Sequence, residues 1–163
     1  YDEKMWDFGR MSSDLRPFKS FEPAENYPVI ELAFAPRTKN LLCLNAATQP
    51  RVYDYDGHEL AVYKKGDVFM RVMRHAAGHI SDITCGAWHP IDDPQFMTGG
   101  TDSTVRLWDV NYKASQKTVI VVRSKDRGTK TKVSAATFTP DAQAIIAAAQ
   151  DGALYMWCAI TKY

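Results

Sequence analysis

The stretch GGTDSTVRLWD, residues 99–109, joins a turn-forming sequence to an apolar run that ends in Trp-Asp. Gly, Asp and Ser favour tight turns, whereas the β-branched and aromatic residues that follow favour a strand. Asp102 lies six residues before Trp108, with Thr98 just upstream and His79 further upstream. Asp, His and a hydroxyl residue can form a catalytic triad, but they can also form a structural hydrogen-bond network. The rest of the chain decides between these alternatives.

The pattern around this stretch is repeated along the chain. Three segments align without gaps, each beginning with a β-branched residue and ending in aromatic, any residue, proline: VIELAFAP (29–36), ITCGAWHP (83–90) and VSAATFTP (133–140). Each is followed, after an intervening apolar run, by an aromatic residue 17 or 18 positions beyond the proline: Tyr53, Trp108 and Trp157. A repeat of about fifty residues is the first property that a fold prediction must satisfy.

Each repeat divides into four short strand-like runs separated by turn sequences rich in Gly, Pro, Asp and Asn. Residues 59–65 and 117–123 supply the fourth run of the first two repeats, and the chain opens with a partial copy, KMWDF (4–8). Residues 141–150 are rich in alanine, which favours a helix on propensity alone. Their register with two strand-like copies favours a strand instead.

Four short strands in a repeat of this length are typical of a β-propeller blade. We therefore predict an all-β fold, a partial propeller of about three four-stranded blades plus the end of a preceding blade. All 163 residues would belong to one domain, divided into a blade end with its connection (1–26) and three blades (27–66, 78–123 and 131–160). Because propellers close into rings of four to eight blades, we expect the remaining blades elsewhere in the same protein.

The middle repeat resembles the WD-repeat family, through Gly78-His79, Thr98, Asp102 and Trp108-Asp109. The resemblance implies that the His, Thr, Asp and Trp side chains form a structural tetrad within one blade. Two observations favour the tetrad over a catalytic triad. Thr98 lacks a Gly-x-Ser-x-Gly environment, and the Asp-to-Trp spacing recurs in the last repeat, between Asp151 and Trp157.

The other repeats depart from this pattern. The first full repeat has Tyr53 in place of the Trp and Ala47 in place of the turn Asp, and the last repeat lacks a Gly-His pair. Trp6 opens the chain as the Trp of a partial copy. We therefore expect one complete tetrad, with Trp6, Tyr53, Asp151 and Trp157 as structural repeat residues. The repeat also places Phe34, Trp88 and Phe138 in the core between sheets.

Two basic segments precede the second and third full repeats, RVMRHAAGH (71–79) and RSKDRGTKTK (123–132). If both loops lie on one face, they form a basic rim across two neighbouring blades, consisting of Arg71, Arg74, Arg123, Lys125, Arg127, Lys130 and Lys132. The rim could contact RNA phosphate or an acidic peptide, or it could be only a solvated loop. No aromatic residue alternates with these charges, so base stacking is not indicated.

The remaining composition excludes several classes of protein. The formal net charge is +1, so no overall field attracts the chain to nucleic acid or membrane. The three cysteines show no metal-ligand spacing, so we expect no metal and no cofactor, and free thiols fit the nucleus or the cytosol. No run approaches the roughly 20 apolar residues of a membrane span.

No convergent group of acids or ligands suggests an enzyme. The family resemblance implies a non-catalytic adaptor with protein partners in a large nuclear assembly, the spliceosome being the first candidate. Chromatin or ubiquitin-ligase complexes are the alternative settings. An RNA-binding module that uses the basic rim is the alternative function.

Overall fold

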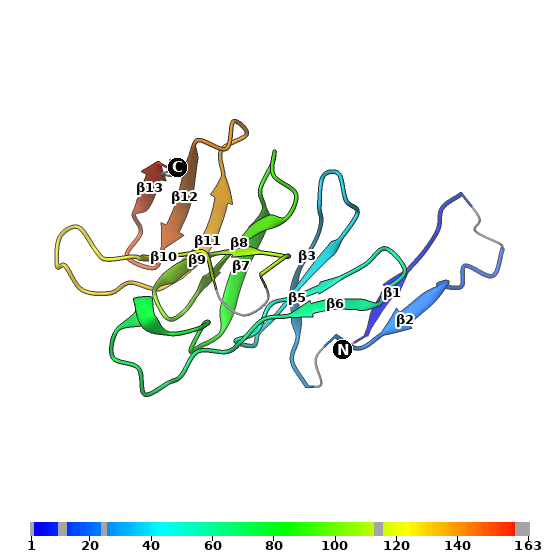
Figure 1. Ribbon diagram of the computed structural model, residues 1–163, viewed down its shortest axis with the longest axis horizontal. Coiled ribbons are helices and arrows are strands. Elements are labelled where there is room, and N and C mark those ends of the chain that lie inside the picture. Colours follow the sequence, from blue (N-terminus) through cyan, green and yellow to red (C-terminus); the bar gives the residue numbers. More distant parts are fainter. Residues whose placement is uncertain (1, 10–12, 24–25, 113–115, 159–163) are drawn as a thin grey trace.

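The computed structural model describes residues 2–9, 13–23, 26–112 and 116–158, which form four antiparallel sheets that follow one another along the chain (Figure 1). Several residues of the expected blade ranges lie outside this description: residues 1, 159 and 160 at the outer ends, residues 10–12 and 24–25 in the range 1–26, and residues 113–115 in the range 78–123. The arrangement confirms the all-β prediction of a partial propeller. The partial copy at the start contributes a two-stranded sheet of β1 (Glu3–Met5) and β2 (Lys19–Phe21).

The next sheet has four strands in chain order: β3 (Val29–Phe34), β4 (Leu41–Asn45), β5 (Arg51–Tyr53) and β6 (Glu59–Val62). We call it blade A. Blade B has the same order: β7 (Ile83–Trp88), β8 (Gln95–Gly100), β9 (Thr104–Asp109) and β10 (Thr118–Val121). Blade C has three described strands: β11 (Val133–Phe138), β12 (Ala144–Ala149) and β13 (Leu154–Cys158).

The alanine-rich run is the strand β12, as its repeat register predicted. It pairs on both sides, with β11 and with β13, so backbone hydrogen bonds of two neighbours override its helical propensity. In the part of the chain that the structure describes, the one helical segment is a 3-10 turn, η1 (Met73–His75). No helix among these residues is long and apolar enough to cross a membrane.

The repeat is also visible in the backbone irregularities. The first strand of each blade pairs with the second through a register shift at the same place, between Val29 and Glu31, between Ile83 and Cys85, and between Val133 and Ala135. A bulge bends a strand and increases its twist locally. The three first strands therefore enter their sheets with the same irregularity, although their sequences share few residues.

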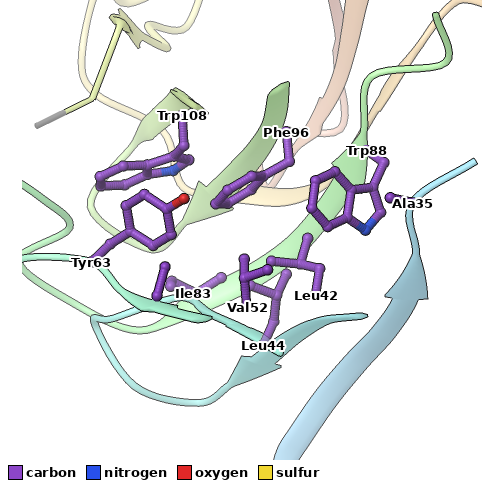
Figure 2. Close-up of a cluster of buried hydrophobic side chains, with 10 residues drawn as sticks. Ala35, Leu42, Leu44, Val52, Tyr63, Ile83, Trp88, Phe96 and Trp108 are labelled. Atoms are coloured by element: carbon purple, nitrogen blue, oxygen red, sulfur yellow. The ribbon is translucent and has the colours of Figure 1, made fainter. Parts of the chain in front are cut away.

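Blades A and B share one apolar core. Figure 2 shows aromatic side chains of blade B facing aliphatic side chains of blade A: Trp108, Phe96 and Trp88 opposite Leu42, Leu44 and Val52. Tyr63 lies against Phe96 and Trp108 at ring-centroid distances of 5.2 and 5.1 Å. The Leu44 side chain of blade A packs directly onto Gly86 of blade B, where an added Cβ would lie 2.3 Å from Leu44 Cδ1. A larger residue at this position would push the two sheets apart.

Polar contacts connect the same sheets. The Trp88 indole donates a hydrogen bond to the Ala33 carbonyl at 2.8 Å, and the Gly86 amide donates to the Glu31 carboxylate at 2.8 Å. Blades B and C share a second apolar core, and the Thr84 hydroxyl donates to the Val133 carbonyl at 2.8 Å. Adjacent blades are thus joined by buried surface together with hydrogen bonds at their first strands.

Of the two outer faces of this array, that of blade A is covered only in part and that of blade C is open in the described part of the chain. Trp88 and Phe138 are 7% and 8% exposed, as their repeat position predicted, but Phe34 is 54% exposed. The prediction that Phe34 lies in the core is therefore wrong for the described residues. Only the two strands β1 and β2 face blade A on that side, and they leave Leu32 exposed as well. At the other end of the array, Leu154 and Met156 of β13 are exposed.

Candidate functional site: a buried tetrad and a basic rim

Blade B brings the four predicted tetrad residues into one hydrogen-bonded chain. The Trp108 indole donates to the Thr98 hydroxyl at 2.7 Å, Thr98 Oγ1 lies 2.7 Å from His79 Nε2, and His79 Nδ1 lies 3.0 Å from Asp102 Oδ2. The His79, Thr98 and Trp108 residues are 0% exposed, and Asp102 is 8% exposed. The chain of contacts links strands β8 and β9, the turn between them and the loop that enters β7.

The contacts fix the tautomer of His79. The Asp102 carboxylate can only accept, so the ring hydrogen of the neutral imidazole is on Nδ1 and is donated to Asp102. Nε2 is then an acceptor, and the Thr98 hydroxyl, which accepts the indole N–H, donates its own hydrogen to Nε2. Every donor in the chain has an acceptor when the imidazole is neutral.

The electrostatics agree with a neutral imidazole beside a carboxylate. Burial lowers the pKa of His79, and this effect outweighs that of the hydrogen bond that His79 donates to Asp102, which acts in the opposite direction. Burial alone would raise the pKa of Asp102, but the hydrogen bonds from His79 and Thr104 bring the pKa below its ordinary value. The Asp102 carboxylate also accepts from the Ile80 amide at 3.2 Å and from the Thr104 amide and hydroxyl at 3.0 and 2.6 Å.

Two residues that the sequence did not point to extend the network. Thr104 donates to Asp102, and its hydroxyl accepts from Arg106 Nε at 3.1 Å. The Arg106 side chain is 0% exposed and lies 3.9 Å from Asp102 Oδ2. Its other guanidinium nitrogens donate to the Ala76 and Met73 carbonyls at 2.8 and 3.1 Å. The sequence did contain a signal for this network: Arg106 is a charged residue at an inward-facing position of β9. An arginine is seldom fully buried without partners, so its position indicates that acceptors lie nearby.

This geometry answers the question of catalysis in blade B. Thr98 is occupied on both sides, as acceptor from Trp108 and as donor to His79, and none of the three side chains is accessible to a substrate. A nucleophile needs an open position beside the reacting atom. The arrangement can stabilise the fold, but it leaves no room for an acyl or phosphoryl group.

The other repeat residues make different contacts. In blade A, Tyr53 is buried, its ring lies 4.8 Å from Phe21, and its hydroxyl donates to the Pro23 carbonyl at 3.3 Å. Cys43 occupies the strand position of Thr98 and donates from Sγ to the buried Glu3 at 2.6 Å. Burial raises the pKa of both groups. Trp6 is half exposed, and its indole donates to the Leu15 carbonyl at 3.0 Å.

Blade C keeps the turn Asp without the histidine. Asp151 accepts from the Tyr155 hydroxyl at 2.6 Å and from the Ala153 amide at 3.1 Å. Tyr155 stacks on Trp157, with ring centroids 6.0 Å apart. Tyr155 occupies the same sheet position as Arg106, and Ala147 occupies that of Thr98.

The loops that enter blades B and C lie side by side and share a basic hollow. The hollow has a volume of about 300 Å³ and contains four of the predicted rim residues: Arg71, Arg74, Arg123 and Lys130. A second hollow, of about 490 Å³, contains Arg127, Lys130 and Lys132, together with the acidic Asp126 and Asp151. Lys130 lines both hollows. Lys125 lines neither, and its backbone amide donates to the Tyr155 hydroxyl at 3.2 Å.

One cluster has the composition of a metal site. Asp54, Asp56 and His58 lie in the turn between β5 and β6, with ligand atoms within 4.8 Å of one another. Asp54 already accepts from the His58 amide at 2.7 Å and contacts His58 Nδ1 at 3.2 Å. These hydrogen bonds within the turn account for the closeness of the three side chains, and we assign no metal to the cluster.

Comparison with known proteins identifies the repeat. The family model described as WD domain, G-beta repeat matches residues 70–109, a range that contains the whole tetrad together with Arg71 and Arg74. In solved structures, the fold is similar to the C-terminal WD40 domain of Sif2, with a TM-score of 0.67 and 18% identity over 87% of this chain and 34% of that one.

Curated relatives match nearly the whole chain. It is 34% identical over 157 residues to Gastrulation defective protein 1 homolog of Drosophila melanogaster and 33% identical over 157 residues to WD repeat-containing protein 70 of Homo sapiens. Both matches cover 96% of this chain and 24% of the relative. An uncharacterized WD repeat-containing protein of Schizosaccharomyces pombe is 40% identical over 125 residues, covering 71% of this chain and 21% of the relative. The chain thus spans about a quarter of the length of these relatives. The repeat pattern, the sheet topology and these similarities together show that the chain belongs to the WD-repeat β-propeller family.

Proposed function

We propose that this protein is a non-catalytic scaffold that binds other proteins through the loops of its propeller. The observation that carries the proposal is the contrast in blade B between a fully bonded interior and a basic hollow at its edge. The tetrad and Arg106 leave no reactive group accessible, whereas Arg71, Arg74, Arg123 and Lys130 surround an open space. WD-repeat propellers generally act as interaction scaffolds, with function carried by loops on a rigid frame.

We place the scaffold in a large nuclear assembly, with the pre-mRNA splicing machinery as the first setting and chromatin or ubiquitin-ligase complexes as the alternatives. Cys43, Cys85 and Cys158 form no disulfide, which fits a reducing compartment such as the nucleus or cytosol. The basic rim adds a surface that suits the acidic components of such assemblies.

The test is affinity capture of the full-length protein from nuclear extract, with and without nuclease. A variant in which Arg123, Lys125, Arg127, Lys130 and Lys132 are changed to Gln is captured in parallel. A matched control changes Arg37, Lys39 and Lys117 to Gln, since these exposed cations lie in loops at the opposite ends of the strands. Protein partners that survive nuclease support the scaffold function, and failure to capture any protein without RNA contradicts it.

A direct RNA-binding function is the second candidate, favoured by the basic rim alone. It predicts that affinity for single-stranded RNA falls steeply with salt, with a slope of roughly −0.7 for each phosphate contact. It also predicts that the five-residue variant loses RNA binding while the control variant keeps it. A slope near zero in filter-binding or anisotropy titrations would exclude this function.

A further inference from the structure

The loop that enters blade B exposes an unusual number of apolar side chains. We call residues 66–76 the η1 loop. Within it, Val68, Phe69, Met70 and Val72 are 69%, 92%, 39% and 52% exposed. Isolated exposed apolar residues are ordinary, but a contiguous group on a folded protein marks an interaction site.

The position of the η1 loop separates it from the uncovered blade faces. The loop packs through η1 against β10, the outermost strand of blade B, and blade B has another sheet on each side (Figure 1). A neighbouring blade of a closed ring would cover Phe34 or Leu154, which lie on the outer faces of the array. It would not reach the outer edge of blade B, so ring closure does not account for the exposed Phe69.

The base of the η1 loop is firmly held. Buried Arg106 donates to the Met73 and Ala76 carbonyls, and Gln116 donates to Ala76 at 2.8 Å. At the tip, the Phe69 amide donates to the Asp67 carboxylate at 2.9 Å. A loop that is already ordered loses little conformational entropy when a partner binds it.

The basic hollow borders the apolar tip directly. Four residues belong to both the η1 loop and the hollow: Arg71, Val72, Met73 and Arg74. Val72, Met73 and Val121 give the lining of the hollow its apolar surface. None of the four cations of the hollow forms an ion pair with an acidic residue among the described parts of the chain. Four unpaired cations around an aliphatic lining are complementary to carboxylates flanking an apolar side chain.

We propose that the η1 loop and the basic hollow together bind an acidic peptide segment of a partner protein, anchored by one large apolar side chain of that segment. This inference rests on the proposed scaffold function and names the chemistry of the partner. The lining of the hollow favours peptide over RNA. RNA binding without sequence preference uses successive aromatic platforms, and Phe69 is the one Phe, Tyr or Trp of the loop and the hollow together.

The experiment selects ligands from a displayed library of random twelve-residue peptides, using the full-length protein. The peptides recovered are synthesised with a fluorescent label, and their affinities are measured by anisotropy. We expect peptides that combine Asp or Glu with Phe, Leu or Trp. Phe69→Ser and the double change Arg71→Ala, Arg74→Ala should each weaken binding by about tenfold or more, the loss typical of a hot-spot residue.

Matched controls change residues at the other end of the strands. Tyr112 is 71% exposed, so Tyr112→Ser removes an aromatic of similar exposure, and Arg37→Ala with Lys117→Ala removes two cations. These variants should bind the peptides as the unchanged protein does. Thermal unfolding of each variant checks that the fold is retained.

Recovery of peptides without acidic residues, or equal binding to the Phe69→Ser variant, would overturn the proposal. A labelled uridine 20-mer that binds more tightly than every peptide and displaces them would assign the surface to RNA instead. Protein capture separates the two levels of inference. If the Phe69→Ser variant retains every nuclease-resistant partner, the peptide site is rejected and the scaffold function stands.

Discussion

The first three strands of blades B and C pair in the same register, but the two blades stabilise the turn between their second and third strands differently. In blade B, Asp102 is buried and accepts from His79, Ile80 and Thr104. In blade C, Asp151 is exposed and accepts from Tyr155 and Ala153. The same residue at the same turn is therefore part of an interior network in one blade and part of a surface turn in the other. The difference arises from the loop before the first strand, which delivers a histidine in one blade alone.

The largest effect should come from removing the turn Asp of blade B. Asp102→Ala leaves the His79 ring N–H and the Thr104 amide without an acceptor and leaves Arg106 as an uncompensated buried charge. We expect a loss of about 3 to 5 kcal/mol in the free energy of unfolding, measured by urea denaturation of the full-length protein. Asp151→Ala is the matched change in blade C and should have a far smaller effect. Equal losses in the two variants would contradict the comparison.

A smaller effect should follow from removing the buried charge of Arg106, which lies beside Asp102 of the tetrad. Arg106→Leu keeps an apolar stem but leaves the Met73 carbonyl without its side-chain donor and the Ala76 carbonyl with Gln116 as its only side-chain donor. We expect about 2 to 3 kcal/mol of destabilisation and faster amide hydrogen exchange across residues 70–78, followed by mass spectrometry. Arg51 occupies the same sheet position in blade A but pairs with the exposed Glu59 at 2.9 Å. Arg51→Leu should therefore cost less than 1 kcal/mol, roughly the value of a surface ion pair.

These two variants also show how far the sequence alone could lead. The spacing of prolines and aromatic residues located the strands of blades A, B and C, including the alanine-rich β12, because each blade repeats the same pattern. It did not locate β2, which lies outside the full repeats. Phe34 shows the limit of that reasoning, since its repeat position is a core position only where a neighbouring sheet covers it. Arg106 and Tyr155 could not be paired with Asp102 and Asp151 from the sequence. Their contacts depend on which side chains face each sheet surface, and the repeats differ at those positions.

The surface part of the site could also be predicted only in part from the sequence. The basic residues of the rim were visible as two charged segments, and the structure places Arg71 and Arg74 beside Arg123 and Lys130 in one hollow. Lys125 belongs to the same charged segment but lies outside both hollows. The Val68–Val72 stretch reads as an ordinary apolar run in the sequence, and only the folded loop shows that it faces solvent.

The third prediction concerns pH and acts on blade B alone. The pKa of His79 is lowered below its ordinary value of 6.5 in the folded protein, so below pH 6.5 the unfolded chain binds the proton more readily than the folded one. Asp102, whose pKa is also lowered, adds to this loss at still lower pH. The free energy of unfolding should therefore fall on going from pH 7 to pH 5, by at most about 1.4 kcal/mol per pH unit for this one proton.

His79→Gln identifies the source of that slope. The variant should be less stable at pH 7 and should lose less stability between pH 7 and pH 5 than the unchanged protein. His89→Gln is the control, because the His89 pKa is also lowered by burial but His89 lies outside the tetrad. If His89→Gln flattens the profile as much as His79→Gln does, the tetrad is not the titrating element.

The smallest effect should come from the hydroxyl of Tyr155. Tyr155→Phe removes the donor to Asp151 and the acceptor of the Lys125 amide but keeps the ring stacked on Trp157. Both hydrogen bonds are accessible to water, which can replace the lost contacts. We expect no resolvable change in the thermal midpoint, with slightly faster exchange of the Ala153 amide.

Thr98→Val is the corresponding change in blade B, since it also removes one hydroxyl, which it replaces by a methyl group of similar size. It should lower the midpoint clearly, because water cannot reach Trp108 or His79 to replace the lost partner. A Tyr155→Phe effect as large as that of Thr98→Val would mean that the surface turn of blade C depends on its hydrogen bond as strongly as the interior of blade B does.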